Sequence, residues 1–179
     1  MTEKVARYSK PAMLVHWLTA LLIIVALPLG GYMSDLRLSP LKLQLISYHK
    51  WIGMTVLLLV IVRILVRMKK GAPAPLPGPT WQLKAAQVTH VLLYVLMFAV
   101  PLSGWLMSSA KGFPVVYLGL VPIPDLVGKN EELGDFFKSV HEVLTSGLLG
   151  LAALHVAAAL KHHLVDRDAT LRRMLPSFR

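Results

Sequence analysis

Four long apolar stretches limit what this chain can fold into. They cover about residues 12–33, 45–67, 85–108 and 140–164 of a chain of 179 residues. Each is long enough to cross the hydrocarbon core of a bilayer as a helix, which takes about 20 residues. Charged residues make up only 16% of the chain, against about 25% in a typical soluble domain. The sequence therefore predicts an all-α integral membrane protein that folds as a four-helix bundle.

We expect a single transmembrane domain over residues 1–179, because the longest segment outside the spans has about 30 residues and cannot bury a large core of its own. The first span is expected to be retained, since its apolar run is longer than that of a signal peptide and lacks a clear cleavage site. The chain has no cysteine, which excludes disulfides, thiolate-bound iron–sulfur clusters and haem attached through a C-x-x-C-H motif.

Glycine and proline mark the expected limits of the helices. The pair Gly30 and Gly31 is expected to loosen or end the first helix, and Pro101 to kink the third helix or weaken its end. The proline-rich segment 71–79 is typical of an extended linker. Residues 131–138, just before the fourth span, are candidates for an amphipathic piece that lies on the membrane surface.

The basic residues predict the orientation of the spans. With the N-terminus in the cytoplasm, 13 of the 19 lysines and arginines, from Lys4 to Arg179, fall in cytoplasmic segments and six fall outside. This bias follows the positive-inside rule and predicts that both termini are cytoplasmic. The formal net charge of +10 is explained by the topology, so no nucleic-acid partner is expected.

Five of the seven histidines lie inside the apolar stretches, at His16, His49, His90, His141 and His155. Ionisable side chains in lipid are costly and mark function by default. His141 and His155 are 14 residues apart on one predicted helix, so they face nearly the same way and lie roughly 21 Å apart along its axis. Depth in the membrane pairs His141 with His49 on the outer side and His155 with His16 on the inner side.

These pairs predict two haems in the bundle core. A haem iron takes two axial imidazoles from opposite faces, and helix bundles commonly hold such cofactors in their cores. Gly53 follows His49 by one turn on the same face and is expected to leave room over a flat ring. Arg63 is placed at inner depth, where it either meets a haem propionate or simply flanks the span. Binding of zinc or copper, or plain hydrogen bonds between helices, are the alternatives for the histidines.

The histidines lie in short motifs: Val-His-Trp at His16, Tyr-His-Lys at His49 and Val-His-Glu at His141, and a Leu-His-Val-Ala-Ala-Ala-Leu-Lys-His-His run that begins beside His155. As a set, and with the closing segment 168–176, they resemble the bacterial cytochrome b561 family over nearly the whole chain. That resemblance implies a four-helix protein of the bacterial inner membrane with two non-covalent haems b. Its outer haem ligands would be His49 and His141, and its inner ones His16 and His155.

The best understood branch of that family resembles a superoxide oxidase. This implies a superoxide:ubiquinone oxidoreductase, which takes electrons from superoxide at the outer face and reduces ubiquinone in the membrane. Basic residues near the outer haem are candidates to steer superoxide, although acidic residues of the same segments nearly cancel their charge; they are Arg37, Lys42, Lys50 and Lys138.

The resemblance also implies a quinone site near the inner haem. His162 follows His155 by seven residues and is a candidate to bind quinone or deliver protons, or else an ordinary cationic helix end. His90 is a candidate to bond a propionate or quinone, or to replace His16 as a ligand. The basic residue that the family has in the inner linker is absent from residues 71–81, and Lys84 is its candidate substitute.

Two other functions remain open at this point. The family also resembles haem-b subunits that accept electrons from a periplasmic dehydrogenase or hydrogenase, and in that case the chain is an electron-transfer partner with a protein donor. A membrane protein without redox chemistry, such as a metal carrier, would use the same histidines to bind ions. The absence of haem absorption would identify the second case.

Overall fold

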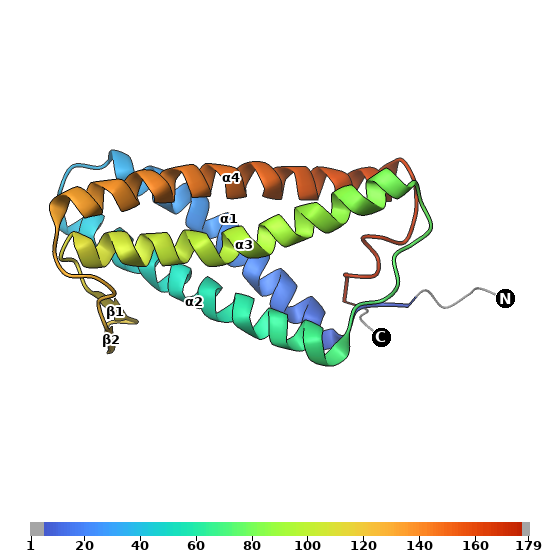
Figure 1. Cartoon of the computed structure of the whole chain (residues 1–179), viewed down its shortest axis with the longest axis horizontal. Helices are drawn as coiled ribbons and strands as arrows, with labels where there is room; N and C mark the ends of the chain where they lie inside the picture. The colour runs from blue at the N-terminus through green and yellow to red at the C-terminus, as the bar shows by residue number, and fades with distance from the viewer. Residues whose placement is uncertain (1–5, 177–179) are drawn as a thin grey trace.

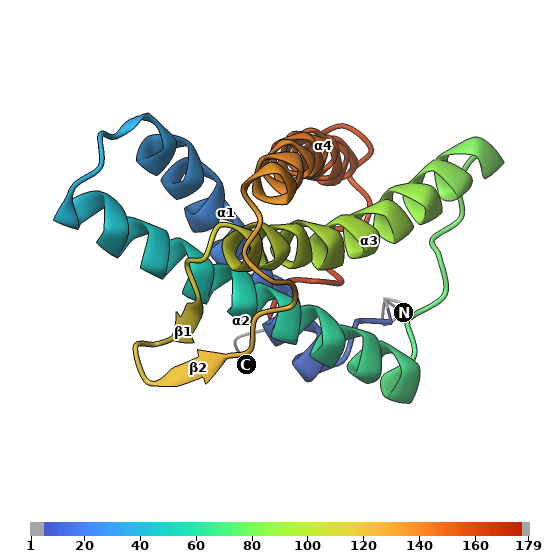
Figure 2. The same cartoon turned by 60° about the vertical axis from the view of Figure 1, so that its left-hand side comes forward.

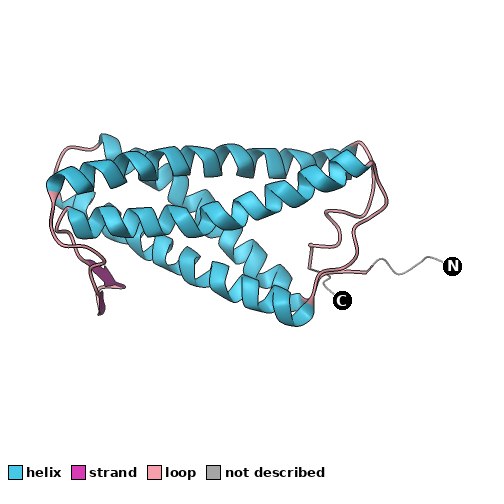
Figure 3. Cartoon of the chain, in the orientation of Figure 1, coloured by secondary structure: helices cyan, strands magenta, loops and turns pink. Residues whose placement is uncertain are grey.

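Four long helices make up most of the protein (Figure 3). The structure is a computed structural model that describes residues 6–176, so the predicted cytoplasmic residues Lys4 and Arg179 lie outside the described residues. All four helices are long and apolar enough to cross a membrane, which confirms the predicted fold class. They are α1 (Lys10–Asp35), α2 (Pro40–Lys70), α3 (Thr80–Ala110) and α4 (Glu131–Leu164).

The helices alternate in direction, so that both ends of the described chain lie at one end of the bundle (Figure 1). We call this the terminal end, because it contains the start of α1 and the residues after α4. The opposite end, which we call the hairpin end, contains a two-stranded antiparallel sheet. The chain segment that connects α3 to α4 forms this sheet. An even number of spans with both termini on one side is the topology expected from the sequence.

The bundle is two helix pairs joined through its centre. α1 packs on α2 and α3 packs on α4, and the contact between α2 and α3 links the pairs (Figures 1 and 2). A small core of Val56, Val60, Met97 and Leu148 fills this junction. Within residues 6–176, the backbone of α4 runs close to that of α3. It does not come comparably close to α1 or α2. The space between α4 and the first two helices is therefore spanned by side chains.

Local capping explains where the helices begin and end. The side chains of Ser9, Ser39 and Asn130 accept hydrogen bonds from backbone N–H groups in the first turns of α1, α2 and α4, as N-cap residues do. α2 ends at Gly71, which adopts φ +69° and donates its N–H to the carbonyl of Arg67. Glycine is favoured there because it enters the left-handed region without strain.

None of the expected interruptions ends a helix or forms a separate piece. α1 continues through Gly30 and Gly31 to Asp35, since backbone groups in lipid are best satisfied inside a helix. Residues 131–138 are the first turns of α4 rather than a separate surface piece, because the Asn130 cap and two acidic residues favour an early start. α3 continues past Pro101 to Ala110, and its ribbon changes direction partway along (Figure 1).

A short hairpin at the hairpin end was not predicted from the sequence. Its strands are β1 (Val115–Tyr117) and β2 (Val121–Ile123). Leu118 and Gly119 both have positive φ in the turn between them, at 55° and 72°, which is the conformation of a type I′ turn. Strands of three residues without an Asn-Gly or Asp-Gly turn give little sequence signal, so the sequence predicts only a loop in this segment.

The segment after α4 closes the terminal end. The Arg173 side chain is only 7% exposed and donates hydrogen bonds to the carbonyls of Ala6 (2.7 Å) and Ala74 (2.8 Å). Trp17 of α1 donates its indole N–H to the Met174 carbonyl at 2.8 Å. The hydrogen bonds of Arg173 thus connect the segment after α4 to the segment before α1 and to the proline-rich linker.

We expect Arg173→Ala to destabilise the protein by about 2 kcal/mol, because the two hydrogen bonds that the buried guanidinium donates to backbone carbonyls would be lost. The measurement is the thermal unfolding temperature in detergent, together with the rate of proteolysis in the linker 71–79. Arg172→Ala is the matched control, since Arg172 is exposed and makes only a 3.5 Å contact. Equal stability of the two variants would contradict a structural role for Arg173.

Candidate functional site

The two histidine pairs expected from the sequence come together in space. At the hairpin end, the His49 and His141 ring centroids are 6.3 Å apart with planes at 85°. At the terminal end, the His16 and His155 centroids are also 6.3 Å apart, at 73°. In each pair one ring comes from α4 and the other from α1 or α2. The pairs therefore lie where α4 has no long backbone contact with those helices.

The separation of the rings fits a metal bound between them. Two imidazoles that bind one ion from opposite sides, each through a nitrogen about 2 Å from the metal, have ring centroids roughly 6.3 Å apart. Both pairs have this separation. Direct hydrogen bonding of the two rings would bring their centroids closer together. The donor set, two neutral nitrogen ligands on an otherwise apolar wall, also suits haem iron.

Two glycines form a cradle for the rings at the hairpin end. A Cβ atom added at Gly30 would lie 3.1 Å from Cε1 of His49, and one added at Gly104 would lie 3.1 Å from Cε1 of His141. Both distances are shorter than ordinary van der Waals contact, so each ring packs directly on helix backbone. Sequence reasoning missed this role, since it interpreted Gly30 as a helix terminator.

Hydrogen bonds orient the His141 ring. Its Nδ1 is 3.0 Å from the Val100 carbonyl and 3.0 Å from Oγ of Ser103. A carbonyl only accepts, so Nδ1 carries the proton that it donates to Val100, and Nε2 keeps the lone pair that a metal would need. By contrast, among the described residues Nδ1 of His16 is buried without a hydrogen-bond partner. This unpaired nitrogen is a second feature that fits a bound group.

The terminal-end pair has additional neighbours. The His90 ring lies 5.4 Å from the His155 ring, closer than the His16 ring. The Arg63 guanidinium lies over the Tyr94 ring at 5.1 Å from its centroid, and Tyr94 follows His90 by one turn of α3. Arg63 therefore reaches the level of His90 from α2, as its spacing from His49 predicted.

Gly53 and Lys84 are not brought into contact with either pair. A Cβ added at Gly53 would meet nothing within 4 Å, so there is open space beside this turn of α2, although no ring packs on it. Lys84 is exposed in the second turn of α3. Neither observation tests the roles expected for these residues.

His162 lies in a polar cluster at the terminal end. Its Nδ1 is 2.7 Å from Asp168 Oδ2 and 3.1 Å from Asp166 Oδ2, and Lys161 pairs with Asp166 at 2.6 Å. Burial raises the pKa of the Asp168 carboxyl, but hydrogen bonds from Thr170 and His162 outweigh it and the pKa lies below its ordinary value. Asp168 is therefore a carboxylate at neutral pH, which holds the Nδ1 proton of His162.

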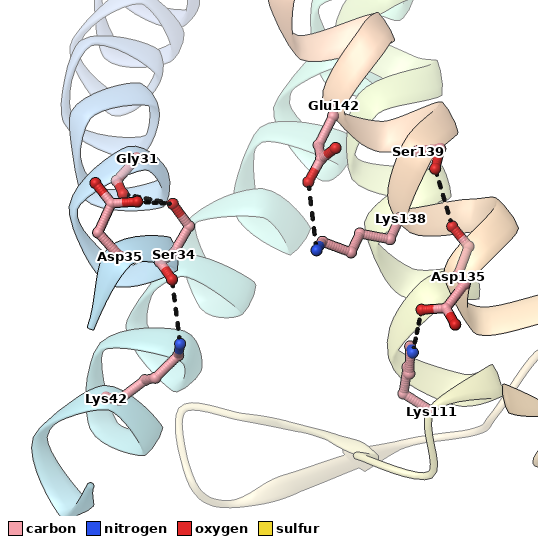
Figure 4. A network of polar contacts seen from close by, with 9 residues as sticks. All are labelled: Gly31, Ser34, Asp35, Lys42, Lys111, Asp135, Lys138, Ser139 and Glu142. Carbon is pink, nitrogen blue, oxygen red and sulfur yellow. Dashed lines mark hydrogen bonds and ion pairs between the residues drawn. The ribbon is translucent and has the colours of Figure 1, made fainter. Parts of the chain in front are cut away.

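The basic residues expected to steer an anion have structural partners. Lys42 donates to the carbonyls of Leu36 (2.6 Å) and Ser34 (3.2 Å), and Lys138 pairs with Glu142 at 3.8 Å (Figure 4). Lys50 donates to the Phe113 carbonyl at 2.8 Å. These contacts place the three ammonium groups at the hairpin end and occupy part of their donor capacity. The Arg37 side chain is exposed.

Comparison with known proteins identifies the class. A family model described as "Prokaryotic cytochrome b561" matches residues 7–177. "Cytochrome b561 homolog 2" of Escherichia coli (strain K12) is 33% identical over 177 residues, covering 97% of this chain and 94% of the relative. "Cytochrome b561 homolog 1" of the same organism is 32% identical, covering 95% and 97%. "Probable superoxide oxidase CybB" of Yersinia pestis is 31% identical over 181 residues, covering 97% and 98%.

Four spanning helices and these matches define a multi-pass protein of the bacterial inner membrane that transfers electrons. The chain belongs to the prokaryotic cytochrome b561 family. This membership confirms the resemblance drawn from the histidine motifs, and it implies haem of the b type. The two ring pairs in the core fit such a group on the geometry given above.

We expect Gly30→Val to lose about half of the haem of the purified protein, because the new side chain displaces the His49 ring from its position on α1. Gly31→Val is the matched control, since a Cβ at Gly31 meets nothing within 4 Å and the helix propensity cost is the same. Haem and protein contents, measured by absorbance, provide the test. Equal haem loss in the two variants would show that helix disruption, and not the His49 ring, is responsible.

Proposed function

We propose that this protein is a superoxide oxidase: a single-domain cytochrome with two haems b that passes electrons from superoxide to ubiquinone. The observation that carries the proposal is the presence of two ring pairs with the same 6.3 Å separation, one toward each end of α4. A relative that is named as a probable superoxide oxidase and aligns over 97% of this chain supports the reaction.

The proposed ligands are His49 and His141 for one haem and His16 and His155 for the other. When bound, the haems supply one-electron redox chemistry at two depths of the membrane. The protein holds the imidazoles at those depths through the rigid spacing of α4. At the hairpin end, the Val100 carbonyl and Ser103 fix the tautomer of His141, and the lipid-facing helices exclude water from the path between the pairs.

We place the terminal end in the cytoplasm. The topology predicted from the sequence assigns 13 of the 19 basic residues to the cytoplasm, and the positive-inside rule favours this orientation. The hairpin end, with His49 and His141, then faces the outside, where superoxide is to be collected. Lys42, Lys50 and Lys138 lie at that end, and we assign them a steering role through their summed field rather than through direct contact with the anion.

The net reaction fixes what the inner side must supply. Two superoxide anions become two molecules of dioxygen, and one ubiquinone takes the two electrons and two protons to become the quinol. We propose that His162, held by the Asp168 carboxylate at 2.7 Å, delivers protons from the cytoplasm. His90 beside His155, Arg63 and Lys84 are the further candidates for the quinone or a haem propionate.

We expect His141→Ala and His155→Ala each to lower the haem content from two per chain to one, because each removes one axial ligand of a different haem. His163→Ala is the control, since His163 lies outside both pairs. The measurement is the ratio of haem to protein after purification. An unchanged ratio in either ligand variant would contradict the assignment of that residue.

The reaction itself is tested by stopped-flow absorbance. We expect superoxide mixed with oxidised protein to produce the bands of reduced haem b at a rate close to the diffusion limit, on the order of 10⁸ M⁻¹s⁻¹. Added ubiquinone should then reoxidise the protein. Haem bands that do not respond to superoxide would contradict the proposal and favour the alternative, an electron-transfer subunit that receives electrons from a periplasmic dehydrogenase or hydrogenase.

A further inference from the structure

The hairpin segment differs in composition from the rest of the loop that contains it. Residues 113–124 form a run of 12 residues, Phe-Pro-Val-Val-Tyr-Leu-Gly-Leu-Val-Pro-Ile-Pro, without a single charged side chain. Charged residues resume on both sides of the run, at Lys111 and Asp125. A loop that is only exposed to water gains nothing from such a composition.

The apolar side chains of the hairpin point outward at its tip. Leu120 is 81% exposed and Leu118 is 55% exposed, and both belong to the turn that joins β1 to β2. Val121 and Phe113 are also exposed. Leu118, Leu120 and Val121 are neighbours at the tip, and Phe113 lies at the base of the hairpin.

The hairpin is fixed at the side of α2, within reach of the bilayer. Trp51 donates its indole N–H to the Val116 carbonyl at 2.7 Å, and the Thr55 hydroxyl is 2.8 Å from the Tyr117 hydroxyl. Thr55 lies a full turn deeper in the span than Trp51, so Tyr117 extends along the helix toward the membrane interior. The hairpin consequently projects sideways from the bundle at the level of the helix ends (Figures 1 and 2).

The tip continues the lipid-facing surface of the helices. Leu118 closes a hollow of about 410 Å³ whose other walls come from α1 and α2, including Val25, Leu29, Trp51 and Ile52. These helix residues belong to spans whose outer sides face lipid. The hollow therefore joins the hairpin tip to the apolar sides of the spans.

We propose that the tip of the β1–β2 hairpin is buried in the bilayer leaflet at the hairpin end and anchors the protein there. The occupant of the apolar surface is lipid, because the surface is continuous with the membrane-spanning one. Insertion stops at the boundary between headgroups and acyl chains, since the open edges of a two-stranded sheet cannot satisfy their N–H and C=O groups in hydrocarbon. Trp51 and Tyr48 at the same level are residues typical of that boundary. This proposal does not depend on which residues bind haem or on the reaction.

The absence of native cysteines makes the test direct. Leu120→Cys is prepared in the purified, haem-loaded protein and placed in phospholipid nanodiscs, which expose both membrane faces. The rate of modification by a charged, water-soluble thiol reagent is then measured. Glu132→Cys, in the first turn of α4 at the same end of the bundle, is the water-exposed control, and Val143→Cys, on the exposed side of α4 within its span, is the lipid-facing control.

We expect Leu120→Cys to react at least about tenfold more slowly than Glu132→Cys and close to Val143→Cys, because lipid excludes the reagent and disfavours the thiolate. The rate should not depend on the ratio of protein to lipid. Reaction as fast as that of Glu132→Cys would overturn the proposal. Slow reaction that becomes fast when the protein is diluted in lipid would also overturn it, because a second copy of the chain would then be the occupant. Val121→Cys, also in the tip, repeats the test if the first variant does not fold.

Discussion

The structure depends on keeping imidazole rings inside an apolar bundle. Each ring carries polar nitrogens that are costly to bury without a partner, yet within residues 6–176 Nδ1 of His16 has no hydrogen-bond partner. The pairs meet at a separation that a bridging metal would give, and each joins α4 to a helix with which α4 has no long backbone contact. The ring pairs thus bridge α4 to α1 and α2 on either side of the junction that Val56, Val60, Met97 and Leu148 fill.

The two ends of the bundle differ in what surrounds the rings. At the hairpin end, the rings pack on the backbone at Gly30 and Gly104, and Val100 and Ser103 hold His141. At the terminal end, the neighbours are His90, Arg63 and the segment after α4, which Arg173 holds in place. Rigid packing at one end suits fast collection of a small anion, and polar groups at the other suit proton uptake, which is the division of labour that the proposed reaction needs.

The sequence was sufficient for the features that follow from periodicity and spacing. Apolar length predicted four spans, and the 14-residue interval on α4 predicted that His141 and His155 would meet partners at two depths. The sequence was insufficient for features that depend on contacts between helices. Gly30 looks like a helix breaker until the His49 ring is seen against it, and Ser103 is an ordinary helix residue until α4 brings His141 to it. The hairpin has strands too short for a periodic signal, and residues 131–138 joined α4 because of a cap whose effect sequence alone underestimates.

The central claim is that one chain holds two haems, each between two histidines. The most direct test is the haem b content per chain of the purified protein, measured as the pyridine haemochrome and combined with electron paramagnetic resonance of the oxidised state. We predict two haems per chain, both low-spin, as two imidazole ligands require. A single haem per chain, or a high-spin signal from either, would contradict the account.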